Sequence, residues 1–280
     1  LAYLNNPADP TLPTNVSFVL IGNPNRPNGG LFERLALLGT VPILDATFGQ
    51  PTPTDTGIQT TDIAFQYDGV ADFPTYPINL LADLNALAGF AYIHGTYLAP
   101  NAKSDPGELP NGLDPATLES TVSEIVANCQ TDPRCQQHGD TTYVTIPTPN
   151  LPLLQPVRDL GSATHLQFIT TPLVDLVQPA LRVLIETGYN RADYGRPTPF
   201  RLIPTANPIT VTVDLVKAVG DGVDADLRLE FHVRGVDAVL RRLQQGHLPV
   251  RLVSVVGERV AVDDRRRHAE GRGRHVRRGP

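Results

Sequence analysis

The chain has 280 residues, 41% hydrophobic and 19% charged, which is typical of a globular protein long enough to bury a substantial core. It has no run of about 18 uncharged apolar residues, so we expect no transmembrane segment. The net charge of −6 hides an asymmetry, because 22 acidic and 10 basic residues precede position 225, whereas 7 acidic and 13 basic residues follow it. Proline also becomes rare there, and the joint change indicates a boundary near residue 225.

The first element that we predict is a strand at residues 16–21, VSFVLI, which is apolar except for Ser17. A continuous apolar run favours a parallel strand that is buried on both faces. The following GNPNRPNGG is a loop by composition. It matches neither of the glycine patterns that bind phosphates, and its prolines remove backbone donors, so we exclude nucleotide binding and expect no cofactor.

The next segment, residues 61–97, organises the rest of the interpretation. Residues 62–67 form a short strand bounded by turn formers, and Asp68-Gly69 is a turn signal at its end. An amphipathic helix follows, because apolar residues recur at helical spacing and predict a buried stripe: Leu80, Leu84, Leu87 and Ala91. His94 continues this stripe and emerges at its end.

An acid after a strand, followed by a histidine, is the order that a serine hydrolase needs for two members of its catalytic triad. The acid orients the imidazole, and the imidazole takes the proton of a serine. Asp68 is the first choice for the acid and Asp72 is the alternative. The competing interpretation is structural: His94 is a core histidine, Asp68 a turn residue and Asp72 a cap of the proline-rich turn.

Several long sequence segments resemble those of a known protein family. VSFVLIGNPNRPNGG, YDGVADFP and NLLADLNALAGFAYIHGTY resemble the PE-PPE domain of mycobacterial proteins, and the resemblance extends to about residue 224. It implies a cutinase-like serine α/β-hydrolase with esterase or acyl-transfer chemistry on acyl esters of the cell envelope, and a secreted or envelope location. His94 matches the family histidine, and YDGVA places Asp68 where cutinase-like enzymes have their acid.

No serine in the sequence fits the nucleophile. Each of the six lies in a strand, a loop, a helix or the tail, and none forms a Gly-x-Ser-x-Gly elbow: Ser17, Ser104, Ser120, Ser123, Ser162 and Ser254. Methionine is absent even from position 1, so we expect a fragment whose elbow lies upstream and which is inactive as it stands. The alternative function is a non-catalytic cell-envelope or host-interaction module on a hydrolase scaffold.

Residues 101–224 are predicted to form a proline-rich, helical, lid-like region. A helix is expected at 113–128, and a helical pair at 168–186, interrupted by Pro172 and Pro179. In an exported protein, Cys129 and Cys135 are expected to form a small disulfide loop, with two free thiols as the alternative. Their spacing is not that of a metal or redox motif, so no metal site is expected.

The tail, residues 225–280, ends in an Arg/Gly/His-rich run that cannot bury a core, so we expect disorder there. A basic arm for nucleic acid lacks the interleaved aromatic residues that stack on bases, and an out-of-frame translation explains the change of composition better. We therefore expect an α/β fold of three parts: the C-terminal half of a hydrolase core (1–100), the lid-like region (101–224) and the basic tail. The expected partner is a lipid or acyl-ester substrate, not nucleic acid.

Overall fold

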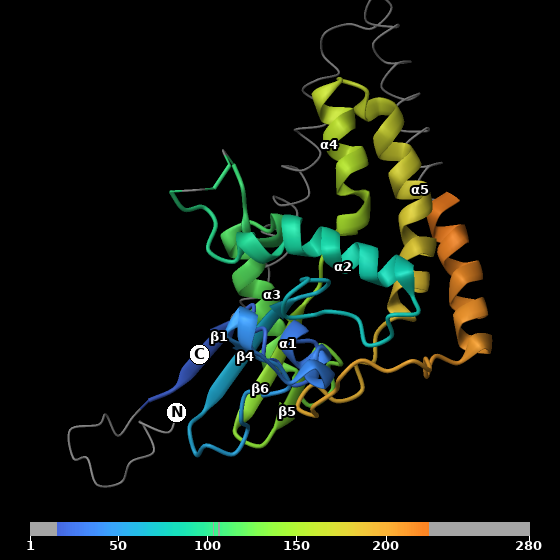
Figure 1. Ribbon diagram of the computed structural model, residues 1–280. Coiled ribbons are helices and arrows are strands. Elements are labelled where there is room, and N and C mark those ends of the chain that lie inside the picture. Colours follow the sequence, from blue (N-terminus) through green and yellow to red (C-terminus); the bar gives the residue numbers. More distant parts are fainter. Residues whose placement is uncertain (1–15, 103, 106, 224–280) are drawn as a thin grey trace, which may run out of the picture. The chain divides into compact units, whose positions relative to one another are not determined.

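The computed structural model describes residues 16–102, 104–105 and 107–223, and within them the chain has an α/β fold (Figure 1). Four strands form one sheet in the order β1 (Phe18–Ile21), β4 (Thr60–Phe65), β6 (Thr141–Ile146) and β5 (Cys135–His138). Strands β1, β4 and β6 are parallel, and β5 pairs antiparallel with β6. The three parallel strands therefore end at the same edge of the sheet, which is where the candidate site lies.

Strand β1 pairs with β4 in parallel, with Ile21 opposite Ile63, which confirms the prediction of a parallel strand here. The prediction that both faces of this strand are buried is wrong, because Val19 and Ile21 are exposed while Phe18 and Leu20 are partly buried. Among the described strands β1 lies at the edge of the sheet, and only one of its faces is covered.

The connection between β1 and β4 contains little regular structure. A four-residue helix, α1 (Leu31–Arg34), is followed by two 3₁₀ turns, Ala36–Leu38 and Pro42–Leu44, and by a hairpin of β2 (Thr40–Val41) and β3 (Ala46–Thr47). The fully buried Arg34 fixes this connection, since its guanidinium donates to the Phe73 carbonyl at 3.0 Å and to Asn28 Oδ1 at 2.8 Å.

Helix α2 (Leu80–Tyr92) begins at Asn79, whose side chain accepts the N–H of Ala82. The predicted buried stripe is wrong: Leu80 is 70% exposed, and Leu84 and Leu87 are exposed too. The buried face consists of small or polar residues: Ala82, Asn85, Ala86 and Gly89. The reason is a close backbone approach, because a Cβ at Gly89 would lie 1.9 Å from the Tyr67 carbonyl oxygen, and a Cβ at Gly69 would lie 2.3 Å from that of Ala86.

In the described part of the chain, four helices follow α2. They are α3 (Pro115–Ala127), capped by Asp114, then α4 (Gln155–Ala163), α5 (Gln167–Glu186) and a helix at 208–223. The 3₁₀ turns Pro110–Gly112 and Pro152–Leu154 precede α3 and α4. The prediction of a pair of helices interrupted by Pro172 and Pro179 is wrong, because α5 continues through both. Each proline removes one helical hydrogen bond, but α5 packs along α4 and α2, and this packing outweighs the loss.

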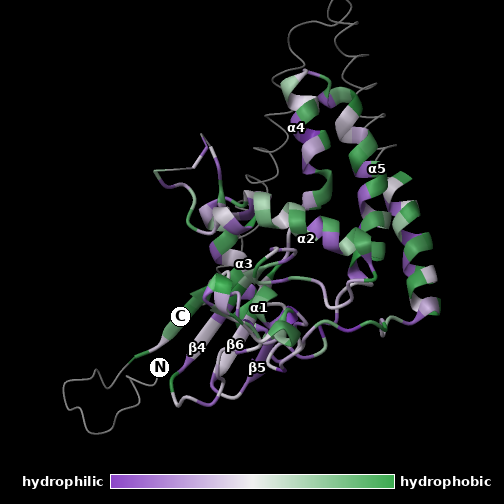
Figure 2. Cartoon of the chain, viewed as in Figure 1, coloured by the Kyte–Doolittle hydropathy of each residue, from purple (hydrophilic) through white to green (hydrophobic). Residues whose placement is uncertain are grey.

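The core lies between the sheet and the helices α2, α3 and α5 (Figure 2). The buried cluster combines residues of β4, β5 and β6 with residues of these helices and of the adjoining turns: Phe65, Tyr67, Ala82, Ile93, Ile125, Cys135, Val144, Ile146, Leu151, Ile185 and Tyr189. Leu181 and Ile185 of α5 pack in this core, whereas Leu173 on the same helix is exposed. This region thus contributes both to core packing and to the surface.

Within the described part of the chain, α5 is the one helix long and apolar enough to cross a membrane. Length and composition alone are weak evidence, because core helices of globular proteins meet the same criterion. The predicted tail at 225–280 lies outside the described residues, and the predicted division at residues 100 and 224 stays a prediction.

Candidate active site

The candidate site lies where the parallel strands β1 and β4 end. Gly22 follows β1 and donates its N–H to the Ile63 carbonyl at 3.2 Å, and Asp68 follows β4 by three residues. In open α/β sheets, ligands bind in the crevice beyond the carboxyl ends of the strands. The sheet therefore brings the predicted acid to the edge where such sites are built.

The turn after β4 is held by both of its own carboxylates. Tyr67 has φ +68°, a left-handed conformation that is unfavourable for a residue with a side chain. Its N–H donates to Asp72 Oδ2 at 2.8 Å, and the Val70 N–H donates to Asp68 Oδ1 at 2.8 Å. The backbone thus fixes the orientation of both acids.

His94 meets Asp68 across this turn. Helix α2 ends at Tyr92, and the 3₁₀ turn His94–Thr96 carries the imidazole so that Nδ1 lies 3.1 Å from each of the Asp68 oxygens. The Asp68 side chain is fully buried, whereas that of His94 is 34% exposed. Phe90, one turn earlier on α2, stacks on the imidazole at 5.9 Å between ring centroids. The pair therefore has a buried acid and a histidine that solvent or a substrate can contact.

The electrostatics of the pair favour the imidazolium form. The hydrogen bond to Asp68 raises the pKa of His94 above its ordinary value, and the negative charge of Asp68 adds to the effect while partial burial opposes it. An ionised Asp68 only accepts hydrogen bonds, so the neutral imidazole carries its proton on Nδ1. This tautomer leaves Nε2 free to accept a proton.

Sequence reasoning missed two further residues of the site. Tyr97 donates its O–H to Asp68 Oδ2 at 2.8 Å and accepts the Phe65 N–H at 2.8 Å, and burial together with the charge of Asp68 raises its pKa so that the donor keeps its proton. A Cβ at Gly22, φ +59°, would lie 3.1 Å from both the His94 and the Tyr97 rings. The only sequence features that pointed to Tyr97 and Gly22 were the GTY segment after His94 and the position of a glycine directly after the first strand.

Asp72, the alternative acid, belongs to a different cluster. Its Oδ1 accepts Arg191 Nη1 at 2.6 Å, and Arg191 also bonds Glu186, which accepts the Tyr67 O–H at 2.8 Å. Asp72 is almost fully buried. Its partner Arg191 is a permanent cation, and among the described residues Asp72 forms no hydrogen bond with His94. This carboxylate therefore stabilises the turn.

Among the described residues, no serine hydroxyl forms a hydrogen bond with His94. Ser17 and Ser104 lie in loops, Ser120 and Ser123 on α3, and Ser162 on α4. The Ser120 hydroxyl donates to the Thr117 carbonyl of its own helix. Ser254 lies outside the described residues. The described site therefore contains an imidazole held at Nδ1 by a buried carboxylate, and among the described residues Nε2 has no hydrogen-bond partner.

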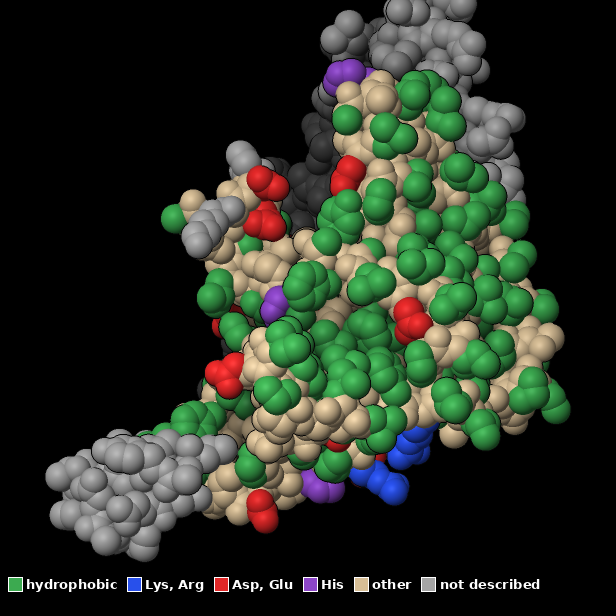
Figure 3. Space-filling model, in the orientation of Figure 1, with side chains coloured by type: hydrophobic (Ala, Val, Ile, Leu, Met, Phe, Trp, Pro, Cys, Tyr) green, Lys and Arg blue, Asp and Glu red, His purple; other side chains and the backbone are tan. Residues whose placement is uncertain are grey.

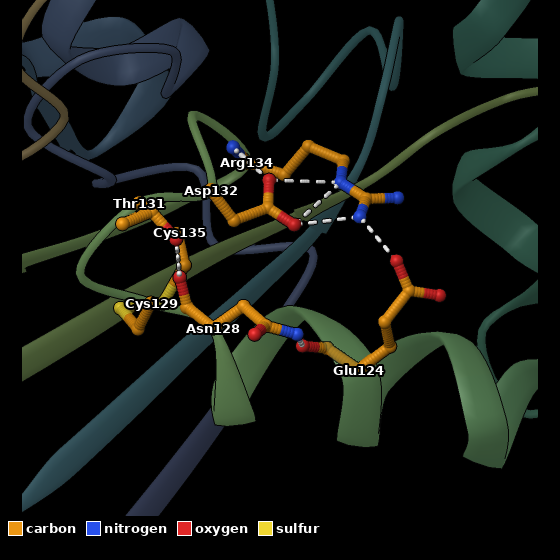
Figure 4. Close-up of a disulfide and its surroundings, with 7 residues drawn as sticks. All are labelled: Glu124, Asn128, Cys129, Thr131, Asp132, Arg134 and Cys135. Carbon is orange, nitrogen blue, oxygen red and sulfur yellow. Dashed lines mark hydrogen bonds and ion pairs between the residues drawn. A yellow bond between two sulfur atoms is a disulfide. The ribbon is translucent and has the colours of Figure 1, made fainter.

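Cys129 and Cys135 form a disulfide that closes the loop between α3 and β5 (Figure 4). Beside it, Arg134 bonds Asp132 at 2.6 Å and Glu124 of α3 at 2.9 Å, so ionic contacts and the disulfide join the same two elements. None of these residues forms a hydrogen bond or an ion pair with Asp68 or His94. In the described ranges, no group of three or more His, Cys, Asp or Glu residues is arranged to hold a metal ion.

Comparison with known proteins identifies relatives. The PE-PPE domain profile matches residues 1–190. Esterase PE16 of Mycobacterium tuberculosis is 40% identical over 76% of this chain and 35% of its own length. The diacyltrehalose acyltransferase Chp2 and the SL1278 acyltransferase Chp1 of the same organism are 28% and 32% identical, over 76% and 65% of this chain and 53% and 38% of their own lengths. The chain spans about a third of the length of PE16, and no solved structure matches it.

Proposed function

This chain belongs to the PE-PPE domain family, and from that membership we propose that it carries the base and the acid of an esterase or acyltransferase on a partial α/β-hydrolase fold. His94 is the general base, and Asp68 is the residue that orients it. The observation that carries the proposal is the 3.1 Å contact between His94 Nδ1 and a fully buried Asp68 at the carboxyl edge of the parallel strands.

The chemistry assigns each atom a task. A serine Oγ attacks the ester carbonyl while Nε2 of His94 takes its proton, and the resulting imidazolium gives that proton to the departing alcohol. In the second half, His94 takes a proton from water for hydrolysis, or from an acceptor hydroxyl for acyl transfer, and the serine is regenerated. Asp68 stays ionised throughout and stabilises the imidazolium.

The nucleophile belongs to another part of the protein in this proposal. None of the six serines stands in an elbow motif, and none of the five described ones bonds His94. We therefore assign the serine to a segment outside these 280 residues, and we expect this chain alone to be inactive. One observation supports the alternative, a non-catalytic module on the same scaffold: among the described residues, Nε2 of His94 has no hydrogen-bond partner.

The relatives support an acyl ester as the substrate, since one is named an esterase and two are named acyltransferases. A secreted or cell-envelope location is part of the proposal, and the Cys129–Cys135 disulfide supports it, because such bonds persist in oxidising compartments.

Active-site labelling tests the proposal. The full-length protein and the 280-residue chain are each treated with a fluorophosphonate, which reacts with activated serines, and assayed on a short-chain acyl ester. We expect labelling and turnover from the full-length protein only, and the loss of both when His94 is replaced by alanine. Labelling of the 280-residue chain would place the nucleophile inside it, and an unlabelled, inactive full-length protein would establish the non-catalytic module.

A further inference from the structure

The tip of the α4–α5 hairpin is a long uncharged surface. Residues 160–174 contain no Asp, Glu, Lys or Arg. Five large apolar side chains in this stretch are exposed, with Phe168 at 70%: Leu160, Leu166, Phe168, Ile169 and Leu173. Figure 3 shows hydrophobic side chains gathered over these helices. Contiguous exposed apolar surface of this kind marks an interaction site.

The sequence leaves these side chains outside because the two helices meet through small residues. Gly161 of α4 is buried, and a Cβ there would lie 1.9 Å from Thr170 Oγ1 of α5. The turn closes with the Leu166 N–H on the Gly161 carbonyl at 2.8 Å. The hairpin is thus packed at its tip without using its leucines or Phe168, so they face outward as a preformed surface.

Charge reappears at the base of the hairpin. Arg158 of α4 and Asp175 of α5 form an ion pair at 2.8 Å across the two helices, and Arg182 further along α5 bonds the carbonyls of Thr148 and Pro149. From Phe168 to Asp175 the helix rises about 10 Å. Helices that lie in a membrane interface bury their apolar face by about 5–10 Å, which is the same scale.

We propose that the tip of the α4–α5 hairpin, residues 160–174, inserts into a lipid surface up to the level of the Arg158–Asp175 pair. The occupant is the apolar phase of a lipid layer and not an anionic headgroup, because the tip has no Lys or Arg to bind phosphate. In the 18-residue apolar stretch of α5, only 11% of the residues are buried, as expected for a helix with a face outside the core. The ion pair limits the depth, since charged groups are costly in hydrocarbon. This inference is independent of the proposed chemistry.

The absence of tryptophan from the chain permits a direct test. Phe168→Trp introduces one fluorophore at the tip, and Leu37→Trp introduces one at a similarly exposed leucine near α1. With uncharged phosphatidylcholine vesicles, we expect a blue shift of the emission for the first variant and none for the second. In flotation assays, the double variant Phe168→Ser, Ile169→Ser should bind vesicles at least tenfold less than the unmodified chain, whereas Leu37→Ser, Ile43→Ser should bind equally well.

Binding should also persist in 0.5 M salt, because it does not depend on charge. Circular dichroism checks that each variant is folded. The proposal is overturned if the unmodified chain does not float, or if flotation requires anionic lipid and is lost in salt. The proposal is also overturned if the emission of the Phe168→Trp variant is already blue-shifted without vesicles. A blue shift at all protein concentrations would mean that another part of the chain covers the tip. A blue shift only at high protein concentration would mean that a second copy of the chain covers it.

Discussion

Asp68 and Asp72 lie four residues apart on one turn, and the groups packed against them differ in kind. Asp68 contacts an imidazole that is partly open to solvent and a tyrosine hydroxyl, whereas Asp72 contacts Arg191 and a backbone N–H. A carboxylate beside a histidine has a partner that exchanges protons near neutral pH, because the histidine changes charge there. A carboxylate beside an arginine does not, because the arginine stays charged. We therefore expect the Asp68 end of the turn to matter for chemistry and the Asp72 end to matter for stability.

The largest expected effect is on turnover through His94. In the full-length protein, His94→Ala should lower kcat by at least about 10⁴-fold, because the proton of the attacking serine loses its acceptor. The matched control is His138→Ala, since His138 also faces an aspartate, Asp193, at 3.6 Å and is also partly exposed. Rates on a short-chain ester, with folding checked by circular dichroism, measure both. Equal rates for the two variants would remove His94 from the mechanism.

Substitution of the two acids should affect different properties, turnover for Asp68 and stability for Asp72. Asp68→Asn should lower kcat by about 10³–10⁴-fold, because an amide neither stabilises the imidazolium nor fixes the Nδ1–H tautomer. Asp72→Asn should change kcat less than tenfold in the folded protein and should lower the free energy of unfolding instead. If Asp72→Asn costs as much turnover as Asp68→Asn, the comparison between the two ends of the turn fails.

Arg191→Met tests only the Asp72 end of the turn, which we expect to be structural. Removing the cation leaves Asp72 nearly buried without its charged partner, so the free energy of unfolding should fall by about 3 kcal/mol. Urea unfolding of the 280-residue chain measures it. The double variant Asp72→Asn, Arg191→Met should recover part of the loss, because the uncompensated charge is gone. An additive loss in the double variant would contradict a direct interaction between the two side chains.

Sequence reasoning found strands β1 and β4, helices α2 and α3 and the order of Asp68 and His94, but it missed strands β5 and β6 and assigned the wrong face of α2. Periodicity places leucines inside, and it does not register that the turn after β4 approaches the backbone of α2 so closely that only glycine fits at positions 69 and 89. The sequence YDGVAD offers two acids with nothing local to distinguish them. The distinction comes from Arg191, more than a hundred residues later, and such long-range ion pairs have no periodic signature.

Tyr97→Phe should have a smaller effect than the loss of Arg191. It removes one donor from Asp68 and the acceptor of the Phe65 N–H, both buried, while the ring can keep its stacking on Phe65 at 4.3 Å. We expect the free energy of unfolding to fall by about 1–2 kcal/mol. Tyr76→Phe is the control, because its hydroxyl bonds only Thr205 in the described structure. An equal loss in both variants would show that Tyr97 has no special role at the acid.

The smallest expected effect is the pH dependence of the Asp68–His94 pair. Since the pKa of His94 is raised in the folded chain, the stability that this pair adds is fully present below the unfolded pKa of about 6.5 and is lost as the pH rises through the folded value. Partial exposure of the imidazole keeps this contribution below about 1 kcal/mol.

An NMR titration of His94 in the 280-residue chain should show a midpoint above 6.5, and Asp68→Asn should lower it, because the amide supplies no negative charge. In the full-length protein, the acidic limb of kcat/KM for the proposed ester hydrolysis should follow the same midpoint, since only the neutral imidazole accepts the proton of the serine. A midpoint that is unchanged in Asp68→Asn would show that the 3.1 Å contact does not set the basicity of His94, and the functional difference between Asp68 and Asp72 would then have no electrostatic basis.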